Sequence, residues 1–309
     1  MRKILSYIEF PQVSDGNLSI DQLQLYSNIH WLLKPLRTLS FKKNWNIQKW
    51  FEKKYKPEDF SKYDVIILSD NILITDSIFN RLVKDIENNA KKDAILIVFW
   101  INIAHDIERF KLSNRWRVGT FDKSDALKYN FRYYGLYYLY GHVNPIKEEH
   151  FIDSELFFIG LDKGRFAHLR RIESLLKPLG IRTNFKYVDS FRCLYNHNYC
   201  KPLNYTKVID NLISSNCILD YYQEGQRGFT QRLYEAIFFN KKLITNNEDI
   251  TKLDLYNENN ILYIKNDDVS RIIDFLEKPF VPYKNEQRLR YQFGSWLDRV
   301  LSDTECDDI

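Results

Sequence analysis

The chain has 309 residues, of which 44% are hydrophobic and 28% charged, so it can bury the core of one large domain or two ordinary ones. Lys and Arg number 45 against 41 Asp and Glu, and a net charge of +4 is too small to require a nucleic-acid partner. We find no N-terminal signal pattern and no apolar run near the roughly 18 residues of a membrane span, so we expect a cytoplasmic protein.

Strand-like and amphipathic segments alternate along the first half of the chain. Strand patterns occur at residues 3–10, 63–70, 94–103 and 117–122, and amphipathic patterns at 19–37 and 76–90. The run AILIVFWINI at 94–103 is apolar throughout, as in strands that are covered on both faces. We therefore predict a parallel α/β domain over residues 1–150.

The same alternation restarts after a polar stretch, IKEEHFIDS, that is typical of a linker. Predicted strands lie at 155–160, 181–188, 216–222, 241–246 and 260–266, and predicted helices at 166–179, 205–215, 229–237 and 268–278. We predict a second Rossmann-like domain over 151–285, and a C-terminal helix within 286–309 that is able to pack back on the first domain. Two such domains would face a cleft at the carboxyl ends of their sheets.

The first loop of the second half, GLDKGRF, combines glycines with cations. Gly160 and Gly164 let the backbone approach a ligand, and Lys163 and Arg165 are placed to meet negative charge at the start of a helix. The pattern favours a phosphate cradle. The alternative is a solvated turn with ordinary surface cations.

A second loop leads into the helix of QRGFTQRLYEAIFF at 226–239. The apolar residues of this helix share one face, which comprises Phe229, Leu233, Ala236 and Ile237. Gly228 frees the backbone, Thr230 can cap the helix, and the first amides favour an anion. Glu235 lies too deep to be a cap. We interpret it as an acceptor for two ribose hydroxyls, with a salt bridge to Arg232 as the alternative.

These loops resemble the nucleotide-sugar-binding domain of GT-B fold glycosyltransferases, in particular bacterial lipopolysaccharide and capsule glycosyltransferases. Those enzymes carry a Gln-x-Gly-Leu-Thr-x-Arg run, then a Glu-Ala helix and a Lys-Leu-Ile-Thr strand. The matching residues here are Gln226, Gly228, Thr230, Arg232, Glu235, Ala236, Lys242, Leu243, Ile244 and Thr245. TFDKSDALKY at 120–129 resembles a Phe-Asp-x-x-Asp-Ala stretch near the domain junction of the family, so the resemblance spans roughly residues 94–265.

The resemblance implies transfer of a sugar from a nucleotide-sugar donor to a hydroxyl of a bacterial surface glycan. It implies that the donor is bound by Gly160, Lys163, Arg165, Gln226, Gly228, Thr230, Arg232 and Glu235. The donor is a substrate, so no resident cofactor is expected. The acceptor would be an oligosaccharide or a lipid-linked glycan, and the protein would be free in the cytoplasm or held at the cytoplasmic face of the inner membrane.

Two departures from common glycosyltransferase patterns shape the expected mechanism. Many retaining GT-B enzymes carry a glutamate eight positions before the helix glutamate, but Arg227 stands there, which favours inversion. The chain has no Asp-x-Asp triplet, so we expect a metal-independent reaction in which Lys163, Arg165 and helix amides stabilise the leaving group.

An inverting displacement needs a base, and the candidates follow strands of the first half. We rank Asp15 first, because Gly16 and the length of its loop suit an acceptor, and His105 is the second catalytic candidate. Asp70 and Asp106 also follow strands, although Asp70 could equally start a turn. We expect Trp100 and Asn102 to line the acceptor side.

Other functions remain open at this point. Basic residues interleaved with aromatic ones at 109–118 and 131–140 favour a nucleic-acid-binding protein, and a catalytically silent nucleotide-sugar-binding scaffold is a third alternative. Cys193, His197 and Cys200 supply three possible ligands where a structural zinc site needs four, so we expect reduced thiols and no metal.

Overall fold

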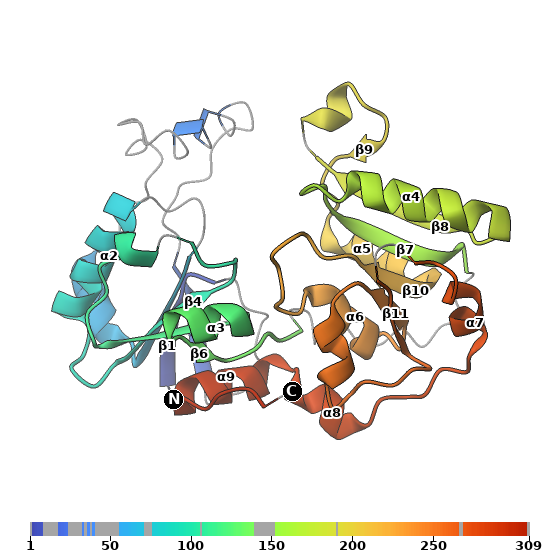
Figure 1. Ribbon diagram of the computed structural model, residues 1–309. Helices are drawn as coiled ribbons and strands as arrows, with labels where there is room; N and C mark the ends of the chain where they lie inside the picture. Colours follow the sequence, from blue (N-terminus) through green and yellow to red (C-terminus); the bar gives the residue numbers. More distant parts are fainter. Residues whose placement is uncertain are drawn as a thin grey trace. The chain divides into compact units, whose positions relative to one another are not determined.

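The computed structural model describes two compact units (Figure 1). They comprise Met1–Tyr134 with Leu301–Glu305, and Gly135–Val300 with Cys306–Ile309. The residues described are 2–8, 18–23, 33, 36–37, 39–40, 56–70, 76–105, 107–138, 152–189, 191–265 and 268–307. The linker expected near residue 150 lies mostly outside them, so the three predicted domain spans stay predictions.

The first unit is built on a six-stranded parallel sheet. In spatial order its strands are β2 (Leu18–Gln22), β1 (Arg2–Ser6), β3 (Val65–Ser69), β4 (Ile95–Trp100), β5 (Trp116–Thr120) and β6 (Arg132–Tyr133). Helical segments are η3 (Pro57–Lys62), α2 (Asp76–Asn89), η4 (Ile107–Arg109) and α3 (Lys123–Tyr129). Helix α2 packs its apolar stripe on one face of the sheet, where Phe79 and Leu82 meet Ile66. The apolar runs at β3 and β4 are buried, as predicted.

The second unit is also built on a six-stranded parallel sheet. In spatial order its strands are β12 (Ile261–Tyr263), β11 (Lys242–Thr245), β10 (Ser215–Asp220), β7 (Ser154–Leu161), β8 (Thr183–Val188) and β9 (Tyr199–Cys200). Its helical segments are α4 (Phe166–Leu176), η5 (Lys177–Leu179), η6 (Arg192–Leu194), α5 (Tyr205–Ile213), α6 (Gln231–Phe238), η7 (Glu248–Lys252), α7 (Ile272–Glu277), α8 (Asn285–Arg290) and most of α9 (Phe293–Ser302), whose last two residues are counted with the first unit.

Helices cover both faces of the second sheet (Figure 1). Successive residues of a strand point to opposite faces, so Phe157 packs with α5 and α6 while Phe158 packs with α4 and α7. The predicted apolar face of α6 is fully buried in the first of these clusters. The α/β class with two Rossmann-like parallel sheets is therefore confirmed. Among the described helices, none combines the length and apolar character needed to cross a membrane.

Each sheet contains one point where the strand order reverses. From β1 the chain adds β2 on one side and then β3 on the other, and from β7 it adds β8 and β9 before β10 returns to the opposite side. Open α/β sheets bind ligands at the carboxyl ends of the strands that flank such a switch point. The topology directs attention to the ends of β7 and β10, and of β1 and β3.

Two segments differ from the sequence patterns. The amphipathic stretch at 19–37 begins in strand, because Leu18–Gln22 pairs in parallel with β1 from Arg2↔Leu18 to Ser6↔Gln22. The C-terminal amphipathic segment divides into α8 and α9 around Tyr291, which is buried beside Tyr234. In both places a contact with a distant part of the chain overrides the local period.

Lys242, a residue of the motif shared with the glycosyltransferases, has a structural contact in this fold. Its ammonium donates to the carbonyl oxygens of Phe275 (2.6 Å) and Leu276 (2.7 Å), and to that of Lys278. The side chain thereby caps the C-terminus of α7 and joins this helix to the start of β11.

We expect Lys242→Met to lower the free energy of unfolding by about 1.5–3 kcal/mol, because the last carbonyls of α7 lose a charged donor. The matched variant Lys252→Met, at an exposed surface pair with Asp249, should change it by less than about 0.5 kcal/mol. Urea unfolding of both variants measures the difference. Equal effects would contradict the capping role.

Candidate functional site

A cavity of about 340 Å³ opens at the switch point of the second sheet. Its walls come from the loop after β7, the loop after β10 and the first residue after β11. The lining includes Lys163, Gly164, Arg165, His168, Tyr221 and Asn246. The rings of His168 and Tyr221 stack with centroids 5.6 Å apart, which gives the cavity a flat aromatic wall. Its position is the one where open α/β sheets hold ligands.

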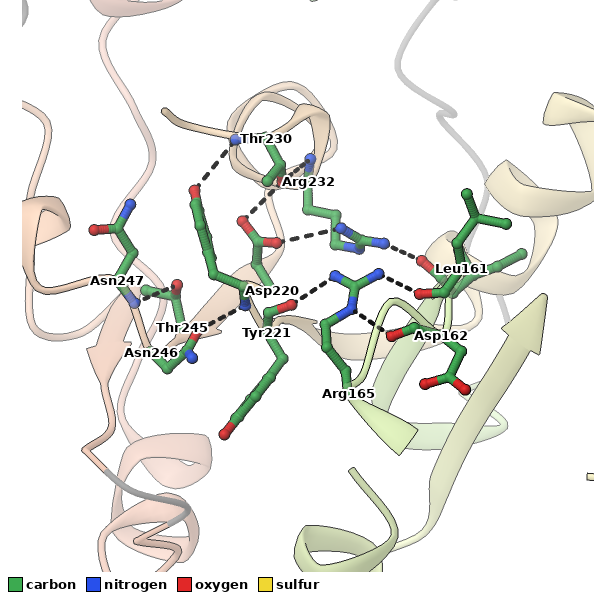
Figure 2. Close-up of polar contacts among 12 residues, drawn as sticks. Leu161, Asp162, Arg165, Asp220, Tyr221, Thr230, Arg232, Thr245, Asn246 and Asn247 are labelled. Carbon is green, nitrogen blue, oxygen red and sulfur yellow. Dashed lines mark hydrogen bonds and ion pairs between the residues drawn. The ribbon is translucent and has the colours of Figure 1, made fainter. Parts of the chain in front are cut away.

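Arg165 joins the carboxyl ends of β7 and β10 (Figure 2). Its guanidinium donates to the carbonyl oxygens of Leu161 at the end of β7, of Asp162 (3.3 Å), and of Tyr221 just after β10 (2.7 Å). The side chain is only 6% exposed. Carbonyl oxygens at strand ends need donors when they are buried, and one planar guanidinium supplies three.

Arg232 forms a second clamp from the first turn of α6 (Figure 2). Its guanidinium pairs with Asp220 at 3.3 Å and donates to the carbonyl oxygen of Ile159. Asp220 is buried, and it also accepts a 2.8 Å hydrogen bond from the hydroxyl of Thr230, the N-cap of α6. We expected an anion at the start of α6. In the structure that anion is the chain's own carboxylate, Asp220.

Gly160 leaves the space that the two guanidinium groups occupy. A Cβ at this position would lie 2.5 Å from Nη2 of Arg232, 3.0 Å from Nη2 of Arg165 and 3.2 Å from the ring of Phe158. Both guanidinium groups lie over that ring, with centres 5.0 and 5.3 Å from its centroid. We predicted that Gly160 would let the backbone approach a ligand. In the structure two arginine side chains occupy the space next to Gly160.

The positively charged side chains near the cavity repel one another. The pKa of Lys163 is lowered by burial and by the nearby charges of Arg165 and Arg232. Burial, and then Arg232, lower the pKa of Arg165 to about 10. Burial raises the pKa of Asp220, and the two arginines oppose this effect. A bound anion would relieve the repulsion among the three cations.

Lys163 stands in an uncommon backbone conformation. Its φ is 44° and that of Gly164 is 82°, so two consecutive residues are left-handed. Asp162, the preceding residue, pairs with Arg192, and the described residues show no ion pair for Lys163. Glu224, which is exposed, is the carboxylate of the opposite wall. A strained turn that presents an unpaired ammonium to a cavity is typical of a binding loop.

The loop between β10 and α6 is held by contacts other than those expected. Gly225, with φ 79°, supplies the left-handed position, whereas Gly228 is not among the positive-φ glycines. The hydroxyl of Tyr222 accepts a 3.2 Å hydrogen bond from the backbone N–H of Thr230. The backbone N–H of Gln226 donates to the carbonyl oxygen of Gln223 in the turn (3.3 Å), and of these two residues Gln223 lines the cavity. The role of Gln226 in binding the sugar donor stays a prediction.

Glu235 is buried on the inner side of α6. Its carboxylate accepts a 3.1 Å hydrogen bond from the hydroxyl of Tyr205, which is bonded in turn to the hydroxyl of Tyr138 (3.0 Å). Burial raises the pKa of Glu235. The carboxylate does not line the cavity after β7, and Arg232, its predicted alternative partner, pairs with Asp220. The ribose interpretation of Glu235 stays a prediction.

In the first unit, Asp70 directly follows β3 at the switch point. Its two carboxylate oxygens accept hydrogen bonds from the backbone N–H groups of Ile101 (2.7 Å) and Asn102 (3.2 Å), which follow β4. Burial raises the pKa of Asp70 to about 6, although both backbone donors act to lower it. An acid that titrates near neutrality at a switch point can exchange protons with a ligand.

The structure describes some of the candidate bases and not others. Asp15 and Asp106 lie outside the described residues. His105 is exposed on the loop after β4. Trp100, expected to line the acceptor side, is 3% exposed and packs edge-on against Phe110 with ring centroids 5.2 Å apart. That side chain is part of the core of the first unit.

Sequence reasoning missed Asp220, the last residue of β10, and Tyr221 and Asn246, which directly follow β10 and the adjacent strand β11. A signal was present, since CILDYY places a carboxylate at the end of an apolar strand. Among the described residues, no group of three or more His, Cys, Asp and Glu side chains could hold a metal ion. Neither Cys193 nor Cys200 forms a disulfide bond with a described residue.

No model of a known protein family matches the chain, and none of the curated proteins matches it either. The resemblance to GT-B glycosyltransferases therefore rests on the residues quoted above.

We expect Gly160→Ala to lower the free energy of unfolding by about 1–3 kcal/mol, because the new methyl group displaces guanidinium groups that are already bound. Gly294→Ala is the matched control. It adds the same methyl group in α9 with no atom within 4 Å, and should be neutral or stabilising by about 0.5–1 kcal/mol. Denaturant unfolding of both variants measures the difference, and a neutral Gly160→Ala would contradict the packing described.

Asp70 should make stability depend on pH. Its folded pKa of about 6 exceeds the ordinary value of 3.8, so its stabilising contribution is complete below pH 4 and is lost as pH rises through 6. Relative to Asp70→Asn, the wild type should therefore lose on the order of 3 kcal/mol of stability between these limits. Urea unfolding across this range measures the change. A pH-independent difference between the two proteins would show that Asp70 titrates normally.

Proposed function

We propose that this chain is a glycosyltransferase that moves a sugar from a nucleotide-sugar donor to a hydroxyl of a bacterial surface glycan. The observation that carries the proposal is the cationic cavity at the switch point of the second sheet. Lys163 and Arg165 line it, and Arg232 lies beside Arg165. The charges of Arg165 and Arg232 lower the pKa of Lys163, and the charge of Arg232 lowers the pKa of Arg165. A ligand with an anionic group at one end and a flat ring at the other would be complementary to this cavity.

The nucleoside diphosphate part of a donor has these two properties. Its phosphates would meet the ammonium of Lys163 and the open backbone at Gly164, where no atom lies within 4 Å of an added Cβ. Its base would lie against the wall formed by His168 and Tyr221. We infer that the two arginines chiefly hold the strand ends and loops of the site in place. Their guanidinium groups bind carbonyl oxygens at the strand ends and the carboxylate of Asp220.

In the proposed reaction, a hydroxyl oxygen of the acceptor attacks the anomeric carbon, and the bond from this carbon to the phosphate oxygen breaks. Positive charge beside the leaving phosphate stabilises the transition state, and Lys163 supplies that charge without a metal ion. The proton of the hydroxyl passes to a base. The candidates Asp15, His105 and Asp70 belong to the first unit. A GT-B arrangement, inversion and metal independence are parts of the same proposal.

Lys163→Ala should weaken nucleoside diphosphate binding about ten- to hundredfold, because it removes a charge-assisted contact worth about 1.5–3 kcal/mol. The ligand-free variant should be at least as stable as the wild type, since a crowded cation is removed. Lys177→Ala, at an exposed position of η5, is the matched control and should bind normally. Calorimetric titration with UDP, GDP, CDP and ADP in the presence of EDTA measures the affinities.

Three outcomes distinguish the alternatives. Selective binding of one nucleotide that Lys163→Ala weakens supports the proposal, and turnover of the corresponding nucleotide sugar separates an enzyme from a silent scaffold. If no nucleotide binds and a single-stranded oligonucleotide does, the protein binds nucleic acid instead. Binding that appears only when EDTA is replaced by magnesium or manganese would overturn metal independence.

A further inference from the structure

The side-chain amide of Asn246 lines the cavity in a fixed orientation (Figure 2). Its oxygen accepts a 2.7 Å hydrogen bond from the backbone N–H of Tyr222. Only the oxygen of an amide can accept, so this bond decides which end of the side chain faces Tyr222. The NH₂ group is left with no hydrogen-bond partner among the described residues. A donor in this position calls for a ligand that accepts a hydrogen bond.

Both sides of this hydrogen bond belong to well-held parts of the fold. The side chain of Tyr222 is buried, and its hydroxyl accepts a 3.2 Å hydrogen bond from the backbone N–H of Thr230 at the start of α6. Next to Asn246, the amide of Asn247 donates to the carbonyl oxygen of Arg227 (2.9 Å). The orientation of the Asn246 amide is therefore set by the fold before any ligand binds.

The amide lies next to the aromatic wall of the cavity. Strands β10 and β11 pair in parallel up to Asp220↔Thr245, so Tyr221 and Asn246 leave neighbouring strands side by side. Neighbouring strands lie about 4.8 Å apart. The ring of Tyr221 stacks with that of His168. A flat ring that packs on this wall would thus present its edge to the Asn246 amide.

Other polar side chains of the cavity do not impose the same selection. The guanidinium of Arg165 is bound to carbonyl oxygens, and Lys163 is assigned to the phosphates. Gln223 also lines the cavity, but no bond to the described part of the chain fixes which end of its amide faces a ligand. It can turn to suit a donor or an acceptor. Among these side chains, Asn246 is the one whose amide is oriented.

We propose that Asn246 recognises the base of the bound nucleotide and selects uracil or a 6-oxopurine over cytosine or adenine. The inference rests on the proposed function, because it takes a nucleotide as the ligand of the cavity. Uracil and guanine carry a carbonyl oxygen that accepts from the NH₂ group. Cytosine and adenine carry an amino group in its place, so two donors would face each other and both would lose their partners.

A second group of the cavity favours the same bases. Uracil and guanine carry a ring N–H beside this carbonyl, whereas cytosine and adenine have a bare ring nitrogen there. Glu224 lines the cavity, and its carboxylate is an acceptor of the kind that such a ring N–H needs. A donor from Asn246 and an acceptor from Glu224 would therefore match uracil and guanine at two positions and oppose cytosine and adenine at both.

Calorimetric titration of the full chain with two pairs of nucleotides tests the proposal. UDP and CDP differ only at the base edge in question, and so do inosine diphosphate and ADP. The wild type should bind UDP at least about tenfold more tightly than CDP, and inosine diphosphate at least about tenfold more tightly than ADP. This comparison needs no variant, so it stands even if a substitution prevents folding.

Asn246→Asp changes the donor and little else. It keeps an oxygen for the N–H of Tyr222, so the variant should melt near the wild-type temperature, and it replaces the NH₂ group by a second oxygen. The added negative charge weakens binding of every diphosphate, so the informative quantity is the ratio of the UDP and CDP affinities. We expect this ratio to fall at least about tenfold, because the new oxygen accepts from cytosine and repels the carbonyl of uracil.

Gln223→Glu is the matched control for charge. It adds the same negative charge to the wall of the same cavity and leaves the oriented amide in place. We expect it to weaken UDP and CDP binding by about the same factor, so that their ratio stays within about twofold of the wild-type value.

The outcomes separate this inference from the proposed function. If the wild type binds nucleotides but does not discriminate within either pair, or if Asn246→Asp leaves the ratio unchanged, the inference is wrong and the proposed function stands. If Gln223→Glu changes the ratio and Asn246→Asp does not, Gln223 recognises the base and the assignment to Asn246 is wrong. If none of the four nucleotides binds, the proposed function and the inference are both overturned.

Discussion

The candidate site depends on one constraint: two guanidinium groups must share the space left by the missing side chain of Gly160. Arg232 is held there by the buried carboxylate of Asp220, and Arg165 by carbonyl oxygens at the ends of β7 and β10. Because each arginine begins or closely follows the start of a helix, this arrangement also fixes the starts of α4 and α6. Replacing the glycine or the carboxylate would disturb the contacts that join these two helices to the strand ends.

The positive charge of the cavity depends on these two arginines and on Lys163. One buried carboxylate, Asp220, pairs with Arg232, and the charges of Arg165 and Arg232 still lower the pKa of Lys163. Lys163 and Gly164 stand in a left-handed turn at the rim of the cavity, and Lys163 is also exposed to solvent. Such strain and charge repulsion persist in folded proteins where a ligand benefits from them.

Both sheets are six-stranded and parallel, but they differ in strand order and in the chemistry of their switch points. In the second unit, cations gather at the ends of β7 and β10. In the first unit, Asp70 follows β3 as a carboxyl group with a raised pKa. The same parallel architecture thus carries a positive site in one unit and a titratable acid in the other, since the scaffold fixes only where strand-end side chains lie.

The sequence by itself determined the α/β class, most strands of both sheets, and the two loaded loops after β7 and β10, because hydrophobic period and glycine placement are local properties of the chain. It also determined which face of α6 is buried. Only the tertiary structure decided the partners: Asp220 for Arg232, Tyr205 for Glu235, and two arginines for Gly160. It likewise turned a helix-like stretch into β2 and located the switch points. The physical reason is that a charged side chain binds whichever group the strand order brings near, and strand order is set by contacts between residues far apart in the chain.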